Sequence, residues 1–319
     1  MKLGIKGILC AAAALSIMAT ACSDKETWTV TCPWAPSGVA AVVSQKASTL
    51  STKYSQDYIL VSEAIKGDVA TINTWVLDKK ANDPNLVFAG EGVLSITPII
   101  DPNKMKFTED DFAYVENLYS SIFVLSCQSK LNIKSIPELQ DYVKNTADTI
   151  NVAVNGATSS EAFLAAALFS SMGAADKLKL TPYTSAAEAA QAVSRGETVF
   201  AISHQSQILE ASEQGLVNVV AAFDNKPLSH GPFAGVEGVG AYNYPYFKNC
   251  CFVMARAGTD AEKVEKLRAL YNEILKDKEV SDWMLNTMLI EVDPMTPEQV
   301  EEHLQNVRNI INEYKDVIL

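Results

Sequence analysis

Short apolar runs rich in β-branched residues alternate along this chain with longer stretches in which apolar positions recur at helical spacing. The apolar runs predict strands at Trp28–Cys32, Tyr58–Val61, Leu86–Ala89, Ile122–Cys127, Ile150–Val154, Val199–Ser203, Val217–Ala222 and Cys250–Ala255. Helical spacing is clear at residues 39–50, 264–275 and 300–314. Because strands and helices alternate, the pattern predicts an α/β architecture with mainly parallel sheets.

A strand followed by a turn of small and polar residues and then by a helix occurs twice. The first turn is Ala35-Pro36-Ser37-Gly38, and the second is Asn155-Gly156-Ala157-Thr158-Ser159-Ser160. Each presents backbone N–H groups at a helix N-terminus beyond a strand's carboxyl end, where open α/β sheets bind ligands and where anions are favoured. The two copies are far apart in the sequence and predict one turn in each of two lobes. Simple helix capping is the alternative interpretation.

Residues 1–21 predict an export signal, because Lys2 and Lys6 precede an apolar stretch that is too short for a stable membrane span. The motif Ala19-Thr20-Ala21-Cys22 fits ordinary signal cleavage and also a bacterial lipobox, in which Cys22 is lipidated. Both interpretations place the cleavage at the same peptide bond, between Ala21 and Cys22. The polar tether 23–26 favours the lipid anchor over a freely secreted protein. We therefore expect an extracytoplasmic protein held at the cell membrane, in the periplasm or on the outer face.

Charge and composition exclude several functional classes. The formal net charge of the 319 residues is −12, with 26 Lys and Arg against 38 Asp and Glu, and no basic run marks a nucleic-acid binder. Three His residues and the absence of a C-x-x-C pair leave little material for a metal site. No nucleophile elbow or phosphate-binding glycine loop occurs. We expect no catalytic residues, no cofactor, no metal and therefore no enzyme.

The cysteines outside the predicted signal leave two interpretations open. In an oxidising compartment, Cys127 could form a disulfide with Cys250 or Cys251. Alternatively, these three residues and Cys32 are small buried hydrophobic side chains.

Motifs in order along nearly the whole mature chain resemble one family. Residues 30–38 look like a strand followed by Pro-Phe-x-Pro-Gly-Gly, and residues 86–98 are similar to a second turn between strand and helix. Asp111-Phe112-Ala113-Tyr114-Val115 matches Asp-Phe-x-x-Val, residues 155–160 look like Gly-Asn-Gly-Thr-Ser-Ser, and Pro182-Tyr183 matches a Pro-Tyr before a helix. The family is that of the extracytoplasmic solute receptors of the tripartite tricarboxylate transporters, also called Bug receptors.

The resemblance implies a two-lobed, type II-like periplasmic-binding-protein fold with a ligand cleft between the lobes. Two crossover strands are expected near Val124–Cys127 and Cys250–Val253, which places the possible disulfide at the hinge. Lobe one would comprise residues 22–127 plus 250–319, and lobe two would comprise residues 128–249.

The resemblance also implies a function. Such receptors hold a small carboxylate through backbone N–H groups, hydroxyls and water, close over it, and deliver it to integral membrane permease subunits. The ligand-binding residues implied for this chain are Pro36, Ser37, Gly38, Gly90, Glu91, Gly92, Thr97, Asn155, Thr158, Ser159, Ser160, Tyr183, Thr184 and His204.

Departures from the family pattern introduce acidic residues. Glu91 either faces the cleft or points to solvent, and Glu161 either faces the cleft or forms a capping box with Thr158. His204 is either a hydrogen-bond donor to ligand or a core residue, whereas His303 is expected to be solvated on an outer helix face. A carboxylate in the cleft would repel a tricarboxylate and attract an amino group, so an amino acid, another zwitterion or a small monocarboxylate is at least as plausible as citrate.

Two other binding functions remain open from the sequence. The chain could serve an ABC importer of the same general fold, or it could be a ligand-sensing surface lipoprotein.

Overall fold

The computed structural model describes residues 25–36 and 38–319, and in this part of the chain the strands form two five-stranded sheets. The first sheet has the order β2-β1-β3-β10-β4 and the second β7-β6-β8-β5-β9. The strands of the first sheet are β1 Glu26–Cys32, β2 Tyr58–Ala64, β3 Asn85–Ala89, β4 Phe112–Ser121 and β10 Asn249–Arg256. Those of the second are β5 Phe123–Gln128, β6 Ile150–Asn155, β7 Leu178–Tyr183, β8 Phe200–His204 and β9 Val217–Ala222.

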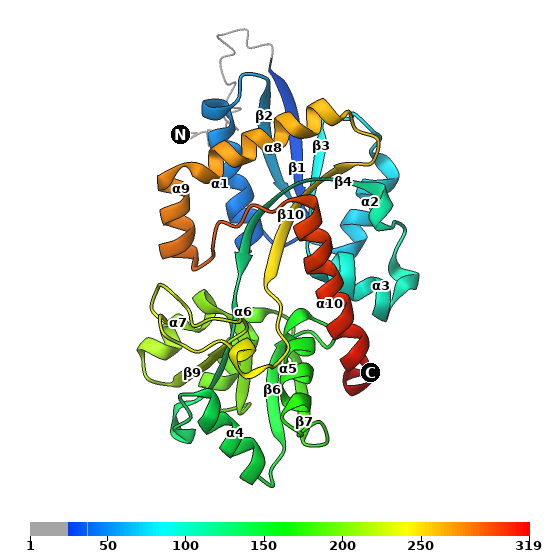
Figure 1. Cartoon of the computed structure of the whole chain (residues 1–319). Coiled ribbons are helices and arrows are strands. Elements are labelled where there is room, and N and C mark those ends of the chain that lie inside the picture. Colours follow the sequence, from blue (N-terminus) through cyan, green and yellow to red (C-terminus); the bar gives the residue numbers. More distant parts are fainter. Residues whose placement is uncertain (1–24, 37) are drawn as a thin grey trace, which may run out of the picture.

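Helices cover both faces of each sheet, as the alternating pattern predicts (Figure 1). Around the first sheet they are α1 Val39–Tyr54, α2 Val69–Asp78, the π-helical turn η1 Gly92–Ile96, α3 Thr97–Ile100, α8 Ala261–Lys276, α9 Lys278–Trp283 and the π-helical turn η6 Met284–Met288. Around the second they are α4 Ile136–Asn145, α5 Ser160–Ser171, α6 Ala186–Ser194, α7 Gln205–Glu213 and the 3-10 turn η5 Val239–Tyr242. None of the helices in the described part combines the length and apolarity needed to span a bilayer.

The chain passes between the two sheets at two places. At the first, β4 ends at Ser121 and β5 begins at Phe123, so Ile122 alone separates strands of different sheets. At the second, the chain returns from the second sheet to β10, which pairs antiparallel with both β3 and β4. The first sheet therefore combines strands from both ends of the chain, which gives the two-lobed α/β fold. The exact lobe boundaries stay a prediction.

The C-terminal helix α10, Pro297–Ile318, belongs to neither lobe alone. Its first half places Val300 and Leu304 in the core beside α2 and η1, whereas Val307, Ile310 and Ile311 join the core of α4 and α5. Figure 1 shows α10 running from one lobe along the side of the other. Because its apolar stripe continues for the whole length, one helix buries area against both lobes.

Two strands, β4 and β7, were not predicted as strands. Strand β4 buries the polar side chains of Glu116, Asn117, Ser120 and Ser121, so its sequence lacks an apolar run. These groups find partners in the tertiary structure: Asn117 Nδ2, for example, donates to the Asp293 carbonyl at 2.7 Å. Strand β7 lies at a sheet edge and includes Pro182, which edge strands tolerate.

The four cysteines of the described residues are all free and buried. Cys127 lies in β5 of the second sheet, where its thiol faces the Ile133 carbonyl at 3.5 Å. Cys250 and Cys251 lie in β10 of the first sheet. No disulfide forms between them because the two strands belong to different sheets, and the interpretation as small buried hydrophobic side chains holds.

Candidate functional site

A cleft of about 750 Å³ lies where strands of both sheets end. Helices follow the carboxyl ends of β1, β3, β6 and β8, and the turns between strand and helix form its walls. Ten residues predicted from the sequence line this cleft: Gly38, Gly90, Glu91, Gly92, Thr97, Asn155, Thr158, Ser159, Ser160 and His204. The cleft is thus the place at which an open α/β fold is expected to bind a ligand.

The wall formed by α1 is suited to a carboxylate. Gly38 is the N-cap of α1, no side chain caps the helix, and its first turn carries no acidic residue. Val39 and Ala40 of that turn also line the cleft. A side chain at Gly38 would place Cβ 3.1 Å from the Ala35 carbonyl oxygen, so glycine permits the tight turn. The helix presents backbone N–H groups and the positive end of its dipole to the cleft.

The opposite wall, formed by α5, carries its own carboxylate. Ser159 is the N-cap and accepts a hydrogen bond from the Ala162 N–H at 3.2 Å, so the predicted capping by Thr158 is wrong by one residue. Glu161 is only 4 % exposed and lines the cleft. Burial raises its pKa to about 7, although hydrogen bonds from its own N–H and from Ser159 oppose the rise. The N-terminus of α5 thus already has a carboxyl group beside it, whereas the first turn of α1 has none.

Glu91 does not point to solvent, and it is not an isolated cleft charge. It is 1 % exposed, and its Oε1 accepts hydrogen bonds from the Cys250 N–H and from His303 Nε2, both at 2.7 Å. His303 is therefore not solvated: α10 turns it inward to meet Glu91, and its side chain is 13 % exposed. The sequence placed His303 among charged outer residues because periodicity does not reveal that α10 crosses between the lobes.

His204 occupies the end of β8 beside the crossover. Its Nδ1 is hydrogen-bonded to the Ser121 hydroxyl at 2.7 Å, and its ring lies 4.6 Å from that of Phe123. Burial lowers the pKa of His204 to about 4, so the imidazole is neutral at physiological pH. His204 therefore packs on Phe123 and also lines the cleft, and its role as a hydrogen-bond donor to ligand stays a prediction.

Three predicted residues lie away from the cleft lining. Pro36 is exposed. The Tyr183 hydroxyl donates to Glu197 at 3.0 Å and the Thr184 hydroxyl to Glu188 at 2.6 Å, both on the outer surface. Strand β7 is an edge strand, so the turn after it begins farther from the centre than the turns after β6 and β8. Ser37 and Cys22 lie outside the described residues.

Several cleft residues were missed by the sequence reasoning. Trp34, Tyr119 and Phe123 supply aromatic surface, and Asp68, Asp101 and Lys104 supply charge. Partial burial raises the pKa of Asp68, and a hydrogen bond from Trp34 opposes the rise. Lys104 pairs with Asp101 at 2.9 Å. Together with Glu91 and Glu161, the lining carries four acidic side chains and a single Lys.

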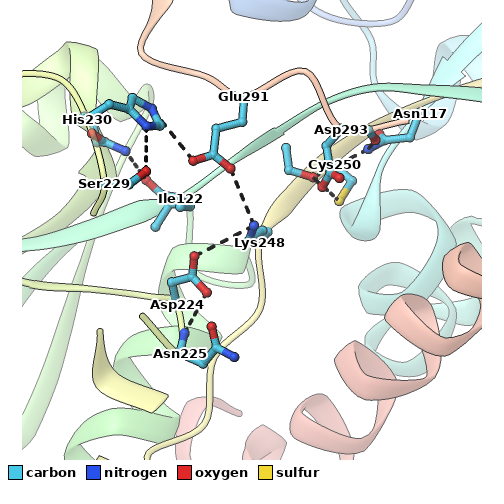
Figure 2. Close-up of polar contacts among 12 residues, drawn as sticks. Asn117, Ile122, Asp224, Asn225, Ser229, His230, Lys248, Cys250, Glu291 and Asp293 are labelled. Carbon is cyan, nitrogen blue, oxygen red and sulfur yellow. Dashed lines mark hydrogen bonds and ion pairs between the residues drawn. The ribbon is translucent and has the colours of Figure 1, made fainter. Parts of the chain in front are cut away.

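A charged network joins the segments that pass between the lobes (Figure 2). Lys248, just before β10, holds its Nζ 3.8 Å from Asp224 and 3.7 Å from Glu291. His230 lies 3.7 Å from the other oxygen of Glu291. Asp224 follows β9 of the second sheet, whereas Glu291 pairs with Ser120 of β4 in the first. The network therefore links segments that adjoin the two different sheets.

Several solved structures share this fold. A TctC solute-binding protein from Polaromonas is 17% identical, covers 90% of this chain and 98% of its own, and superposes with a TM-score of 0.74. MatC from Rhodopseudomonas palustris, solved with bound malate, is 21% identical with coverage of 92% and 99% and a TM-score of 0.69. Another R. palustris protein, solved with adipate, is 16% identical, covers 92% and 97%, and has a TM-score of 0.75.

The family assignment rests on a sequence model rather than on these distant likenesses. None of the curated proteins matches the chain significantly. The model of the tripartite tricarboxylate transporter family receptor, TctC, matches residues 42–318. This range includes both sheets apart from β1, and the cleft lining apart from Trp34 and the α1 wall of Gly38, Val39 and Ala40. The chain therefore belongs to the TctC family of solute-binding receptors.

Proposed function

We propose that this protein is an extracytoplasmic receptor that captures a small carboxylate or zwitterionic solute in the cleft, closes on it about the hinge, and delivers it to integral membrane permease subunits. The family membership and the position of the cleft at strand ends of both sheets support this function. Hinge closure around a ligand in such folds excludes water and completes contacts from both lobes.

The unequal charge of the two helix N-termini carries the proposal on ligand chemistry. At α1, backbone N–H groups meet the cleft without an acidic neighbour in the first turn, which suits a ligand carboxylate. At α5, Glu161 already occupies the corresponding position. A second ligand carboxylate there would face a buried acid, whereas an amino group would gain a partner. We infer that the preferred solute carries one carboxylate and one amino group.

A matched pair of solutes tests this inference. Adipate and 6-aminohexanoate have the same number of carbons, but the second has an aminomethyl group where adipate has its second carboxylate. In a thermal-shift assay, a ligand at 100 times its Kd stabilises the folded protein by about 2.7 kcal/mol. We expect a panel of zwitterions, including 6-aminohexanoate, to raise the melting midpoint more than the matching dicarboxylates.

Two outcomes decide between parts of the proposal. If dicarboxylates give the larger shifts, the receptor function stands and the assignment of an amino group is wrong. If no carboxylate, amino acid or other zwitterion shifts the midpoint, the receptor function itself is contradicted.

The location of the receptor is also part of the proposal. Residues 1–21 direct export, and lipidation of Cys22 anchors the domain at the membrane through the tether 23–26. Cell fractionation tests the anchor. The wild-type protein should require detergent for extraction from the membrane fraction. The Cys22→Ser variant should either appear in the soluble fraction or remain as the unprocessed precursor. Recovery of the wild-type protein in the soluble fraction without detergent would contradict lipidation.

A further inference from the structure

Three side chains of the kinds that bind transition metals meet beside the cleft, which two of them, Glu91 and Cys250, line. Glu91 follows β3, Cys250 lies in β10 and His303 lies in α10, so they come from three distant parts of the sequence. One ligand atom from each residue lies within 4.8 Å of the others. Glu91 and Cys250 are buried, and His303 is half-buried. The three residues thus offer a metal ion one thiol, one imidazole and one carboxylate.

The spacing of the three ligand atoms is close to that of a tetrahedral site. Bonds of about 2.3 Å to sulfur and about 2.0 Å to nitrogen or oxygen place neighbouring ligand atoms roughly 3.3 to 3.6 Å apart around Zn²⁺. Because no pair of ligand atoms is more than 4.8 Å apart, each pair needs to approach by at most about 1.3 Å. The hydrogen bond between Glu91 Oε1 and His303 Nε2, now 2.7 Å, must open by about 0.6 Å. Side-chain torsions provide movements of this size.

The surroundings of the thiol are negatively charged. Cys250 Sγ lies 3.3 Å from the Ser120 hydroxyl, which donates to Asp293 at 2.5 Å. Figure 2 shows the sulfur beside Asp293, whereas the nearby ammonium of Lys248 is directed to Asp224 and Glu291. Burial and the charges of Glu91 and Asp293 raise the pKa of the Cys250 thiol well above its usual value. A divalent cation would offset these carboxylates and favour the thiolate.

We propose that Glu91, Cys250 and His303 form a binding site for a divalent transition-metal ion such as Zn²⁺. On binding, the Cys250 thiol releases its proton to solvent. The proton that His303 Nε2 donates to Glu91 is lost to solvent and Nδ1 takes one up, so that the neutral imidazole binds the metal through Nε2. Glu91 exchanges the hydrogen bond from His303 for a bond to the ion. Thiolate and imidazole ligands select Zn²⁺ and its neighbours over Mg²⁺ or Ca²⁺. Three protein ligands leave a fourth position for water or another ligand.

Cobalt is a direct probe of this geometry because a thiolate bound to Co²⁺ gives a charge-transfer band in the near ultraviolet. The purified protein, reduced and freed of metal, is titrated with Co²⁺ in the absence of any solute. We expect one equivalent to produce the band together with the visible bands of a tetrahedral ion, and one equivalent of Zn²⁺ to remove both. Cys250→Ser should lose the charge-transfer band.

Zinc affinity supplies the second measurement. Removing a ligand with Cys250→Ser or His303→Gln should weaken Zn²⁺ binding by more than the roughly 10–100-fold that loss of an outer partner costs. The matched controls are Cys127→Ser and His230→Gln, which remove residues of the same types outside the group. Both should retain the band and the affinity.

Two results would overturn the site. The first is a wild-type protein that gives no thiolate band with Co²⁺, a measurement that requires no variant to fold. The second is a band that persists in Cys250→Ser. Because no solute is present, failure of the metal site leaves the receptor function to be judged by the solute assay.

Discussion

Replacing Glu161 by Gln should make the stability of the protein less dependent on pH. The carboxyl group is buried at the N-terminus of α5, and its pKa rises from 4.5 to about 7 in the folded protein. Between these values the folded state holds a proton that the unfolded state has released, so the free energy of unfolding falls as the pH rises. Each pKa unit corresponds to about 1.4 kcal/mol, which gives a loss of about 3 kcal/mol for this group.

The glutamine variant removes this titration while keeping a similar shape. We expect Glu161→Gln to match the wild type within about 1 kcal/mol near pH 4.5 and to exceed it by about 3 kcal/mol near pH 7.5. Urea unfolding followed by tryptophan fluorescence at the two pH values measures the difference. Glu188→Gln is the matched control, because Glu188 lies in the first turn of α6 but is exposed. The reasoning fails if the gain from Glu161→Gln is equal at both pH values.

Two further variants test contacts at the cleft and outside it. In chelator-containing buffer, His303→Ala should lower the free energy of unfolding by about 2–3 kcal/mol, because the buried Glu91 carboxyl group loses a hydrogen-bond partner. A loss no larger than that of exposed variants would show that the pair does not stabilise the fold. Tyr183→Phe should change stability by no more than about 0.5 kcal/mol and leave solute affinity unaltered, because its hydroxyl donates to the exposed Glu197 and Tyr183 does not line the cleft. Weaker solute binding in calorimetric titration would contradict this and place Tyr183 in the site.

The individual elements of the cleft follow from local sequence. The tight turn at Gly38 favours a residue without a side chain, since a Cβ would lie 3.1 Å from the Ala35 carbonyl oxygen. Small polar residues after β6 satisfy the first N–H groups of α5. These are interactions between neighbours in the chain, so residue type and spacing reveal them. The resemblance to the family then indicated that the separate turns face one cleft.

Electrostatic partners could not be found in this way. Glu91 and His303 meet because α10 packs on both lobes, and the sequence pattern shows only that this helix has an apolar stripe. Strand β4 was missed for a related reason: its buried Glu116 and Asn117 are satisfied by Asn272 and Asp293, which follow far along the chain. A polar residue looks exposed in the sequence whenever its partner is distant.

The sequence by itself thus determined the α/β alternation, the positions of the cleft turns and the excess of acidic over basic residues, because propensity, capping and composition can be read over short stretches of chain. Only the tertiary structure decided which charges are paired, which cysteines stay apart and which turns reach the cleft. Burial and long-range pairing set the free energy of each charged group, as at Glu161 and the pair of Glu91 with His303. These quantities depend on every element packed around the group and therefore exist only in the folded protein.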